Sequence, residues 1–292
     1  MKDFAITQAL VKFVCCFVPA KKWRTKIRYR FLVNPRLKYQ LLKKGFTLDD
    51  GIITTPEGVH IDVSSTAGCP LYSVKEVFVK NEYNLEIGRE SVLIDIGMNR
   101  AAASLRFATI ENIKSIYAYE PFKPTFDMAM RNLELNPHLS SKIHAFNVGL
   151  GRKDQTLELP YESSQSGVMS TTHDVCKNTP NTETVIVKDA ATELERIIDQ
   201  NSNCNIIVKC DCEGAEFEIF ERLDEQRLVG RFDVVIMEYH FEPPERIVNI
   251  LTRANFAVQR KTASLRSKTG FIYAVRMPER AEQRSLQSIK SE

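Results

Sequence analysis

The sequence predicts an α/β fold built on a mostly parallel, doubly wound sheet. From about residue 91 onward, short aliphatic runs of strand length alternate with amphipathic stretches of helical length. This alternation indicates βαβ units, whose parallel sheets bind ligands at the carboxyl ends of the strands. Two further β-rich runs, FAVQRKT and GFIYAVRM, predict a C-terminal antiparallel pair, and a basic helical arm is expected at the N-terminus.

The expected elements follow one another along the chain. Strands are expected at residues 92–97, 115–121, 142–151, 205–211 and 233–240, with a strand and a helix within 183–198. The other helices are expected at 101–113, 125–136, 214–223 and 243–256. Gly149 and Gly151 have no helix after them and are interpreted as a turn. The small, polar run at 163–172 is expected to be a lid over a ligand or simply a loop.

The chain divides by composition into four parts. Residues 1–45 form the basic arm, and residues 46–90 form a small β/α lead-in that begins with short strands joined by Asp-Gly and Pro-Glu-Gly turns. Residues 91–278 form the main domain, and residues 279–292 form a polar tail.

The arm carries a charge that the overall value of +3 conceals. Residues 1–44 hold 12 of the 40 Lys and Arg residues and one of the 37 acidic residues, which leaves 28 basic and 36 acidic residues in the body. Trp23, Ile27 and Phe31 recur at helical spacing beside Lys22, Lys26 and Arg30. This pattern predicts an interfacial helix that binds an anionic membrane surface through residues 1–33. The alternative is a basic helix docked on its own domain or on a partner subunit of a homo-oligomer.

The apolar start, the acidic body and the cysteines exclude several classes of protein and predict where the protein is located. The apolar start at residues 4–18 is too short to cross a bilayer, which needs about 20 residues. The acidic body argues against nucleic acid as a partner. The seven cysteines are odd in number and lack zinc-site spacing, so a reducing compartment is expected. The predicted location is therefore cytoplasmic, peripheral on the inner face of the membrane.

The first strand-to-helix turn is the expected cofactor site. It contains Asp95, Gly97 and Asn99 but lacks the G-x-G-x-x-G of a dinucleotide cradle. Asp95 suits a cofactor that carries positive charge. Glu120, at the end of the second strand, can accept both hydroxyls of a ribose. Together these residues favour S-adenosylmethionine over NAD.

A second group of polar residues ends two later strands. Asp211 and Glu213 follow one strand, and Glu238 and His240 end the next, so all four are expected near the carboxyl edge. Methyl transfer to a hydroxyl needs a proton acceptor, and His240, with an ordinary pKa of about 6.5, suits that role, as would a carboxylate. Asp211 would orient the hydroxyl, whereas Glu213 could instead cap the following helix. No metal ligand is assigned, and a divalent cation held by the acids is left undecided.

The motifs DIGMNRAAASLRFA, YAYEPFKPT, NLELNP, FNVGLG, IIVKCDCEGAEFEIFE and VVIMEYH resemble, in this order, those of the FkbM methyltransferases. The resemblance covers about residues 80–276, and K-x-D-x-E-G-A-E at 209–216 is its most distinctive part. It implies a Rossmann-like class I methyltransferase fold, with S-adenosylmethionine as methyl donor and a sugar hydroxyl as acceptor. It also suggests Asp95, Gly97, Asn99 and Glu120 as cofactor contacts. The family commonly has Gly where this chain has Ala101.

Asn147, at the end of the third strand, is a candidate neighbour of the adenine, with a turn-capping role as the alternative. The function expected from the sequence is O-methylation of a sugar hydroxyl of a glycan or glycolipid precursor at the membrane surface. Two alternatives remain open at this point: a non-catalytic scaffold that keeps the methyltransferase fold, and an NAD-dependent nucleotide-sugar oxidoreductase.

Overall fold

The structure is a computed structural model that describes residues 10–16, 18, 27, 31, 33–65, 69–173, 179–262 and 267–278. Residues 10–16 are helical. Most of the predicted membrane-binding arm and the whole polar tail lie outside the described residues. Among the helices that are described, none has the length and apolar character needed to span a bilayer.

The centre of the molecule is a seven-stranded sheet in the order β12-β13-β11-β10-β4-β5-β6. Strands β4, β5, β6, β10 and β11 run parallel to one another, and β13 is antiparallel to both β11 and β12. The predicted fold class is thereby confirmed. Their bounds are Ser91–Ile96 (β4), Ile113–Tyr119 (β5), Ile143–Phe146 (β6), Asn205–Cys210 (β10), Val234–Tyr239 (β11), Phe256–Lys261 (β12) and Gly270–Arg276 (β13).

The chain adds successive strands on one side of β4 and then, with β10, on the other side. From β4 the chain moves outward through β5 to β6, and it later returns to the other side of β4 with β10. Such a reversal opens a crevice at the carboxyl ends of the two central strands, where open α/β sheets bind their ligands. The residues that follow β4 and β10 are therefore the first to consider for a functional site.

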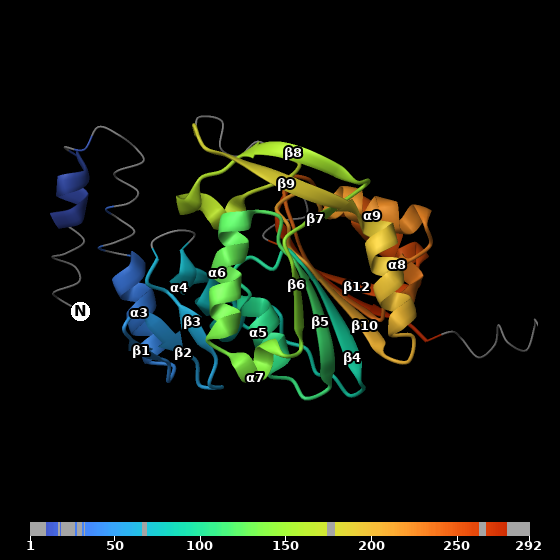
Figure 1. Ribbon diagram of the computed structural model, residues 1–292, viewed down its shortest axis with the longest axis horizontal. Coiled ribbons are helices and arrows are strands. Elements are labelled where there is room, and N and C mark those ends of the chain that lie inside the picture. The colour runs from blue at the N-terminus through green and yellow to red at the C-terminus, as the bar shows by residue number, and fades with distance from the viewer. Residues whose placement is uncertain are drawn as a thin grey trace, which may run out of the picture.

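Helices cover both faces of the sheet (Figure 1). Leu93 belongs to the core shared with α5 and α6, whereas its neighbour Ile94 belongs to the core shared with α8, α9 and α10. Successive residues of a strand point to opposite faces, so a strand buried on both sides must be continuously apolar, as β4 mostly is. The helices are Ala102–Ala108 (α5), Lys123–Glu134 (α6), Pro137–Ser140 (α7), Ala190–Gln200 (α8), Glu216–Glu225 (α9) and Glu245–Arg253 (α10), with the 3₁₀ turn Val229–Arg231 (η4) before β11.

The lead-in packs on the α5 and α6 side of the molecule (Figure 1). Its Ile53 and Ile61 belong to the same buried cluster as Leu93. The side chains of Asn132 and Asn136 accept hydrogen bonds from the backbone of β3, at 2.8 and 2.9 Å. The lead-in consists of Thr47–Asp49 (β1), Ile52–Thr54 (β2), His60–Asp62 (β3), Pro70–Lys75 (α4) and the π-helical Glu76–Lys80 (η2), and the helix Asn34–Leu42 (α3) at the end of the arm precedes it.

A second sheet, in the order β7-β9-β8, lies across the carboxyl end of the main sheet (Figure 1). It contains Gly149–Gly151 (β7), Gln155–Pro160 (β8) and Thr182–Asp189 (β9), and the 3₁₀ segment Ser163–Val168 (η3) follows β8. The turn predicted at Gly149 and Gly151 is therefore wrong, and the single strand predicted at 142–151 is two strands. The glycines permit close packing instead: a Cβ on Gly151 would lie 2.8 Å from a methyl group of Val187.

Candidate functional site

The loop after β4 has a backbone that few side chains tolerate. Gly97, Asn99 and Ala101 all have positive φ, at 84°, 51° and 63°. A Cβ on Gly97 would lie 1.8 Å from the carbonyl oxygen of Asp211, so only glycine fits where the ends of β4 and β10 meet. Ala101 adopts the left-handed conformation directly before α5. The family's preference for Gly at this position thus reflects the backbone, which Ala101 adopts at a cost of about 1–2 kcal/mol.

Asp95 lies behind this loop rather than in a pocket. Its carboxylate is fully buried, accepts a hydrogen bond from Ser104 Oγ at 2.5 Å and pairs with Lys209 Nζ at 3.0 Å. Lys209 Nζ also donates to the carbonyl of Gly97 at 2.6 Å. Asp95 therefore fixes the loop through Lys209 and lines neither of the two pockets described below, so the structure shows a loop-holding role and its role as a cofactor contact stays a prediction.

Glu120 lies at the end of β5 and faces the loop. Its two carboxylate oxygens accept the backbone N–H groups of Asn99 and Phe122, each at 3.0 Å. Burial raises the pKa of Glu120 to about 8, although the two N–H groups act against that change. Asn147 holds the same turn from outside, because its amide donates to the carbonyls of Glu120 and Pro121. Of the two roles expected for Asn147, the structure shows the turn-holding one.

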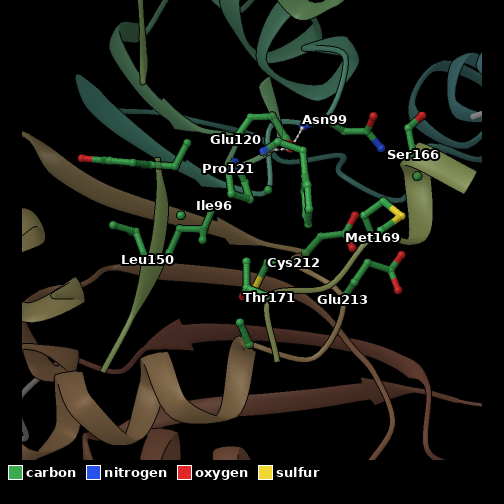
Figure 2. A pocket seen from close by; sticks show the side chains of 17 residues that line it. Ile96, Asn99, Glu120, Pro121, Leu150, Ser166, Met169, Thr171, Cys212 and Glu213 are labelled. Carbon is green, nitrogen blue, oxygen red and sulfur yellow. Dashed lines mark hydrogen bonds between the residues drawn. The ribbon is translucent and has the colours of Figure 1, made fainter. Parts of the chain in front are cut away.

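An inner pocket opens between the loop after β4, the end of β5 and η3 (Figure 2). Glu120 and Asn99 form its polar side, and Ser166 Oγ is buried there with no hydrogen-bond partner among the described residues. Apolar side chains complete it: Ile96, Phe122, Leu150 and Met169. A carboxylate acceptor, an unsatisfied hydroxyl and apolar walls suit the ribose and adenine of an adenosyl group, so the residues present fit S-adenosylmethionine.

An outer pocket of about 510 Å³ adjoins the inner one. The lead-in supplies one wall with Tyr72, Glu76 and Tyr83, while the ends of β10 and β11 supply the other. Both pockets are lined by Gly97, Asn99, Gly167, Asp211 and Glu213. Asp211 and Glu213 therefore stand at the boundary where a group held in one pocket would meet a group held in the other.

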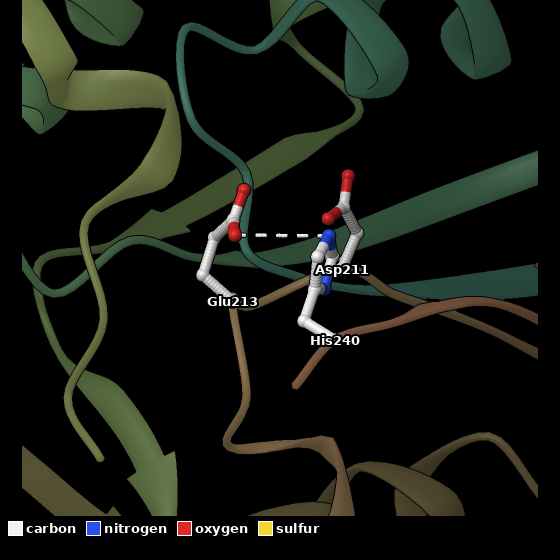
Figure 3. Close-up of side chains that lie close together, drawn as sticks. All are labelled: Asp211, Glu213 and His240. Carbon is white, nitrogen blue, oxygen red and sulfur yellow. Dashed lines mark ion pairs between the residues drawn. The ribbon is translucent and has the colours of Figure 1, made fainter. Parts of the chain in front are cut away.

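Asp211, Glu213 and His240 come together as the sequence predicts (Figure 3). One side-chain ligand atom of each lies within 4.8 Å of the other two. His240 Nε2 is 3.6 Å from Glu213 and 3.7 Å from Glu238, and Tyr83 donates a 2.9 Å hydrogen bond to Asp211 Oδ2. The edge of the sheet thus carries a half-buried cluster of acids around one imidazole.

The acids change the protonation expected for His240. Burial favours the neutral ring, but the hydrogen bond to Glu216 and the charges of Glu213 and Asp211 outweigh it and raise the pKa of His240 to about 9. The expected pKa of about 6.5 is therefore wrong for this arrangement. In the absence of a bound cation, this raised pKa favours the protonated imidazole at neutral pH, which argues against the proton-acceptor role predicted for His240. Burial also raises the pKa values of Glu213 and Glu238 to about 8.

Glu216 is the residue whose role the sequence interpretation missed. Its buried carboxylate accepts the backbone N–H groups of Cys212 at 3.1 Å and Gly214 at 2.8 Å, and it also contacts His240 Nδ1 at 3.0 Å. Glu216 thus satisfies the helix start in place of Glu213, whose side chain remains in the cluster. The signal was available, because Glu216 is the last residue of the K-x-D-x-E-G-A-E motif.

The strand order, the reversed C-terminal strand β13 and an acid at the end of the second strand define a Rossmann-like class I methyltransferase fold. The methyltransferase FkbM domain model matches residues 95–259, which is more than half of the chain. The chain therefore belongs to the FkbM methyltransferase family, as the motifs predict. This assignment also removes the support for an NAD-dependent oxidoreductase.

The chain is similar to a curated protein of Beauveria bassiana (strain ARSEF 2860) named Methyltransferase 1. The two are 27% identical over 172 residues, which cover 52% of this chain and 66% of that relative. Among solved structures, a FkbM methyltransferase from Methylobacillus flagellatus KT has 13% identity and a TM-score of 0.41, with 82% of this chain and 58% of that chain covered. The human methyltransferase 10 domain containing protein has 15% identity and a TM-score of 0.45, with 77% and 91% covered.

Proposed function

We propose that this chain is an S-adenosylmethionine-dependent O-methyltransferase that acts on a sugar hydroxyl of a glycan or glycolipid precursor at a membrane surface. The observation that carries the proposal is the meeting of two pockets at Asp211 and Glu213. The residues that line the inner pocket suit a methyl donor, and the outer pocket, at about 510 Å³, is wide enough for an acceptor. The family membership supports methyl transfer as the reaction.

The inner pocket would hold the donor. When bound, S-adenosylmethionine supplies an electrophilic methyl group. Glu120 would accept the ribose hydroxyls, and the apolar side chains of Ile96 and Leu150 would pack against the adenine. Asn99 and Phe122 keep the carboxylate of Glu120 in place through their backbone N–H groups. These two backbone hydrogen bonds thus hold the buried carboxylate in one orientation before a ligand binds.

The outer pocket favours a neutral acceptor rich in hydroxyl groups. Its walls carry the carboxylates of Glu76, Asp211, Glu213 and Glu238. Carboxylates accept hydrogen bonds from sugar hydroxyls, and the rings of Tyr72 and Tyr83 provide flat apolar surface. These acids outnumber Arg100 and Lys209, which also line the pocket, so a phosphate-rich acceptor such as nucleic acid is disfavoured.

The proton of the acceptor hydroxyl is proposed to pass to a carboxylate, Glu213 or Glu238. Both line the outer pocket, and their pKa values of about 8 lie below the pKa of about 9 of His240, so these two acids lose their protons before His240 does as the pH rises. As the proton leaves, a lone pair of the hydroxyl oxygen attacks the methyl carbon, and the carbon–sulfur electron pair returns to sulfur. His240 then balances the charge of the surrounding acids and holds them in position.

The basic arm would bring this site to an anionic membrane surface on the cytoplasmic side. Residues 1–33 carry the cationic and apolar stripes, and the helical residues 10–16 expose Leu10 and Phe13. The full chain should sediment with vesicles of anionic lipid but not with vesicles of neutral lipid. Salt should release it, since each Lys or Arg near the surface contributes about 1 kcal/mol of electrostatic binding free energy. Equal binding to both lipids, or none, would remove the membrane from the proposal.

The acceptor class can be tested in cells. Surface glycans and glycolipids from cells with and without the gene should differ by one methyl group per modified sugar in mass spectrometry. Restoring the gene with Asp211→Asn should not restore that methyl group. Identical glycans in both strains would reject a sugar acceptor.

A further inference from the structure

We propose that Asp211, Glu213 and His240 bind one divalent transition-metal cation at the boundary between the two pockets. These residues each offer one ligand atom, and the three atoms lie within 4.8 Å of one another. The set combines carboxylate oxygens with an imidazole nitrogen, and the cation would replace the proton that His240 Nε2 carries when no metal is bound. Imidazole favours cations such as Zn²⁺, whereas carboxylates also suit Mn²⁺, so this mixed set differs from the all-oxygen sites typical of Ca²⁺.

The first supporting observation is the way His240 is held. Its Nδ1 contacts the fully buried carboxylate of Glu216 at 3.0 Å, and two backbone N–H groups hold that carboxylate. Metal-binding histidines almost always donate their second ring N–H to a carboxylate or carbonyl, which orients the ring and makes the other nitrogen a better ligand. His240 has this arrangement, and its Nε2 is directed at Glu213 (Figure 3).

The second observation is the spacing of the ligand atoms. His240 Nε2 lies 3.6 Å from Glu213 Oε2 and 3.7 Å from Glu238 Oε1, beyond the range of a good hydrogen bond. Two ligands that each lie about 2.1 Å from a tetrahedral cation are about 3.4 Å apart. The distance between His240 Nε2 and Glu213 Oε2 therefore suits two ligands that share a cation better than two groups that bond to each other.

The third observation is the excess of negative charge. Asp211, Glu213, Glu216 and Glu238 surround a single imidazole in a partly buried site. Lys209 Nζ lies 3.9 Å from Asp211 Oδ2 but is 3.0 Å from Asp95, which it neutralises. Tyr83 and Lys209 both approach Oδ2, so Oδ1 of Asp211 is the oxygen left for a cation among the described residues. A divalent cation would stabilise the ionised, ligand-forming state of these crowded acids.

The role of the cation rests on the proposed function, whereas its binding does not. A cation at this boundary would coordinate the acceptor hydroxyl and make it more acidic. With Asp211 and Glu213 engaged as ligands, Glu238, which lies 3.7 Å from His240 Nε2, is the neighbouring carboxylate that would receive the proton. The oxygen then bonds to the methyl carbon, and the carbon–sulfur electron pair passes to the departing thioether.

The test is a titration of the chelator-treated full chain with Mn²⁺, followed by electron paramagnetic resonance, with Zn²⁺ as competitor. One site is expected. Glu213→Gln and His240→Ala should each weaken binding by at least about tenfold, and Glu216→Gln by about 10–100-fold through the loss of ring orientation. Glu242→Gln is the matched control, because Glu242 is a half-exposed acid two residues from His240 that pairs with Arg246 instead. This control should bind Mn²⁺ as the parent does.

Thermal melts check that every variant is folded. If His240→Ala does not fold, the test rests on Glu213→Gln, because Glu213 is less buried than His240 and Glu216. A Kd above about 1 mM for both Mn²⁺ and Zn²⁺ would overturn the inference, because that affinity is weak. Equal affinity for the metal in the parent, the cluster variants and the control would also overturn it. Binding of S-adenosylhomocysteine, measured on the same samples, reports separately on the proposed function. Methyl transfer that persists at full rate in excess chelator would overturn the catalytic role of the cation.

Discussion

Replacement of Glu120 by Gln should weaken cofactor binding strongly and remove its dependence on pH. The parent carboxylate offers acceptors to the ribose while two backbone N–H groups hold it. Gln has nearly the same size but no charge and one acceptor fewer. With about 1–2 kcal/mol for each charge-assisted hydrogen bond, the loss is about 2–4 kcal/mol. Since about 1.4 kcal/mol corresponds to a factor of ten, the Kd should rise by about 30- to 700-fold.

The pH dependence follows from the environment of the same carboxyl group. Burial raises the pKa of Glu120 from 4.5 to about 8 in the free protein. Ribose hydroxyls donate to the charged form, so binding below pH 8 must release a proton. The Kd of the parent should therefore fall about tenfold per pH unit as the pH rises toward 8 and then level off. Glu120→Gln should show no such slope.

The assay is isothermal titration calorimetry with S-adenosylhomocysteine, the non-reactive product, in two buffers with different enthalpies of ionisation. The buffer dependence of the heat reports proton release directly. Glu134→Gln is the control, because Glu134 is an exposed acid at the end of α6. A Glu120→Gln variant that binds within about threefold of the parent, with no proton release in either protein, would refute the placement of the ribose at Glu120.

Three further predictions concern stability, each read from thermal or urea unfolding. Gly97→Ala should unfold the loop or cost at least about 3 kcal/mol, because its Cβ would lie 1.8 Å from the Asp211 carbonyl; a stability equal to the parent would show that the two strand ends separate easily. Ala101→Gly should leave stability equal or higher, since relief of about 1–2 kcal/mol of left-handed strain offsets the greater entropy of glycine; a clear loss would contradict the strain. For Glu120, whose folded pKa is raised, the free energy of unfolding should fall by a few kcal/mol as the pH rises from about 4.5 to 8, and Glu120→Gln should remove that part of the decline.

The main sheet could be predicted because its strands are buried on both faces. A strand such as β4 must be continuously apolar, and the polar residue that follows it marks the carboxyl edge. That rule located Gly97, Asn99, Glu120 and the acids after β10. It could not show that the side chain of Asp95 pairs with Lys209, because the alternation of side chains along one strand does not identify the partner on the neighbouring strand.

The contacts that shape the site come from residues far apart in the sequence. Tyr83 reaches Asp211 across 128 positions, and no local pattern signals that the lead-in forms a wall of the outer pocket. The pKa of His240 likewise depends on acids in the loop after β10 and at the start of α9, which the residue's own type cannot reveal. The strand β7 was mistaken for a turn because its glycines serve close packing against Pro121 and Val187 rather than chain reversal.

Transfer of a labelled methyl group tests the central claim most directly. The purified full chain would be incubated with S-adenosylmethionine labelled with ¹³C at the methyl group and a glycolipid extract from cells that lack the gene, with and without Mn²⁺. The account predicts a new ¹³C methyl ether on a sugar, detected by NMR and as one added methyl group in mass spectrometry, and predicts its loss in Asp211→Asn with S-adenosylhomocysteine binding retained. A parent protein that binds the cofactor yet labels no hydroxyl, or that labels a nitrogen or a carboxylate instead, would contradict it.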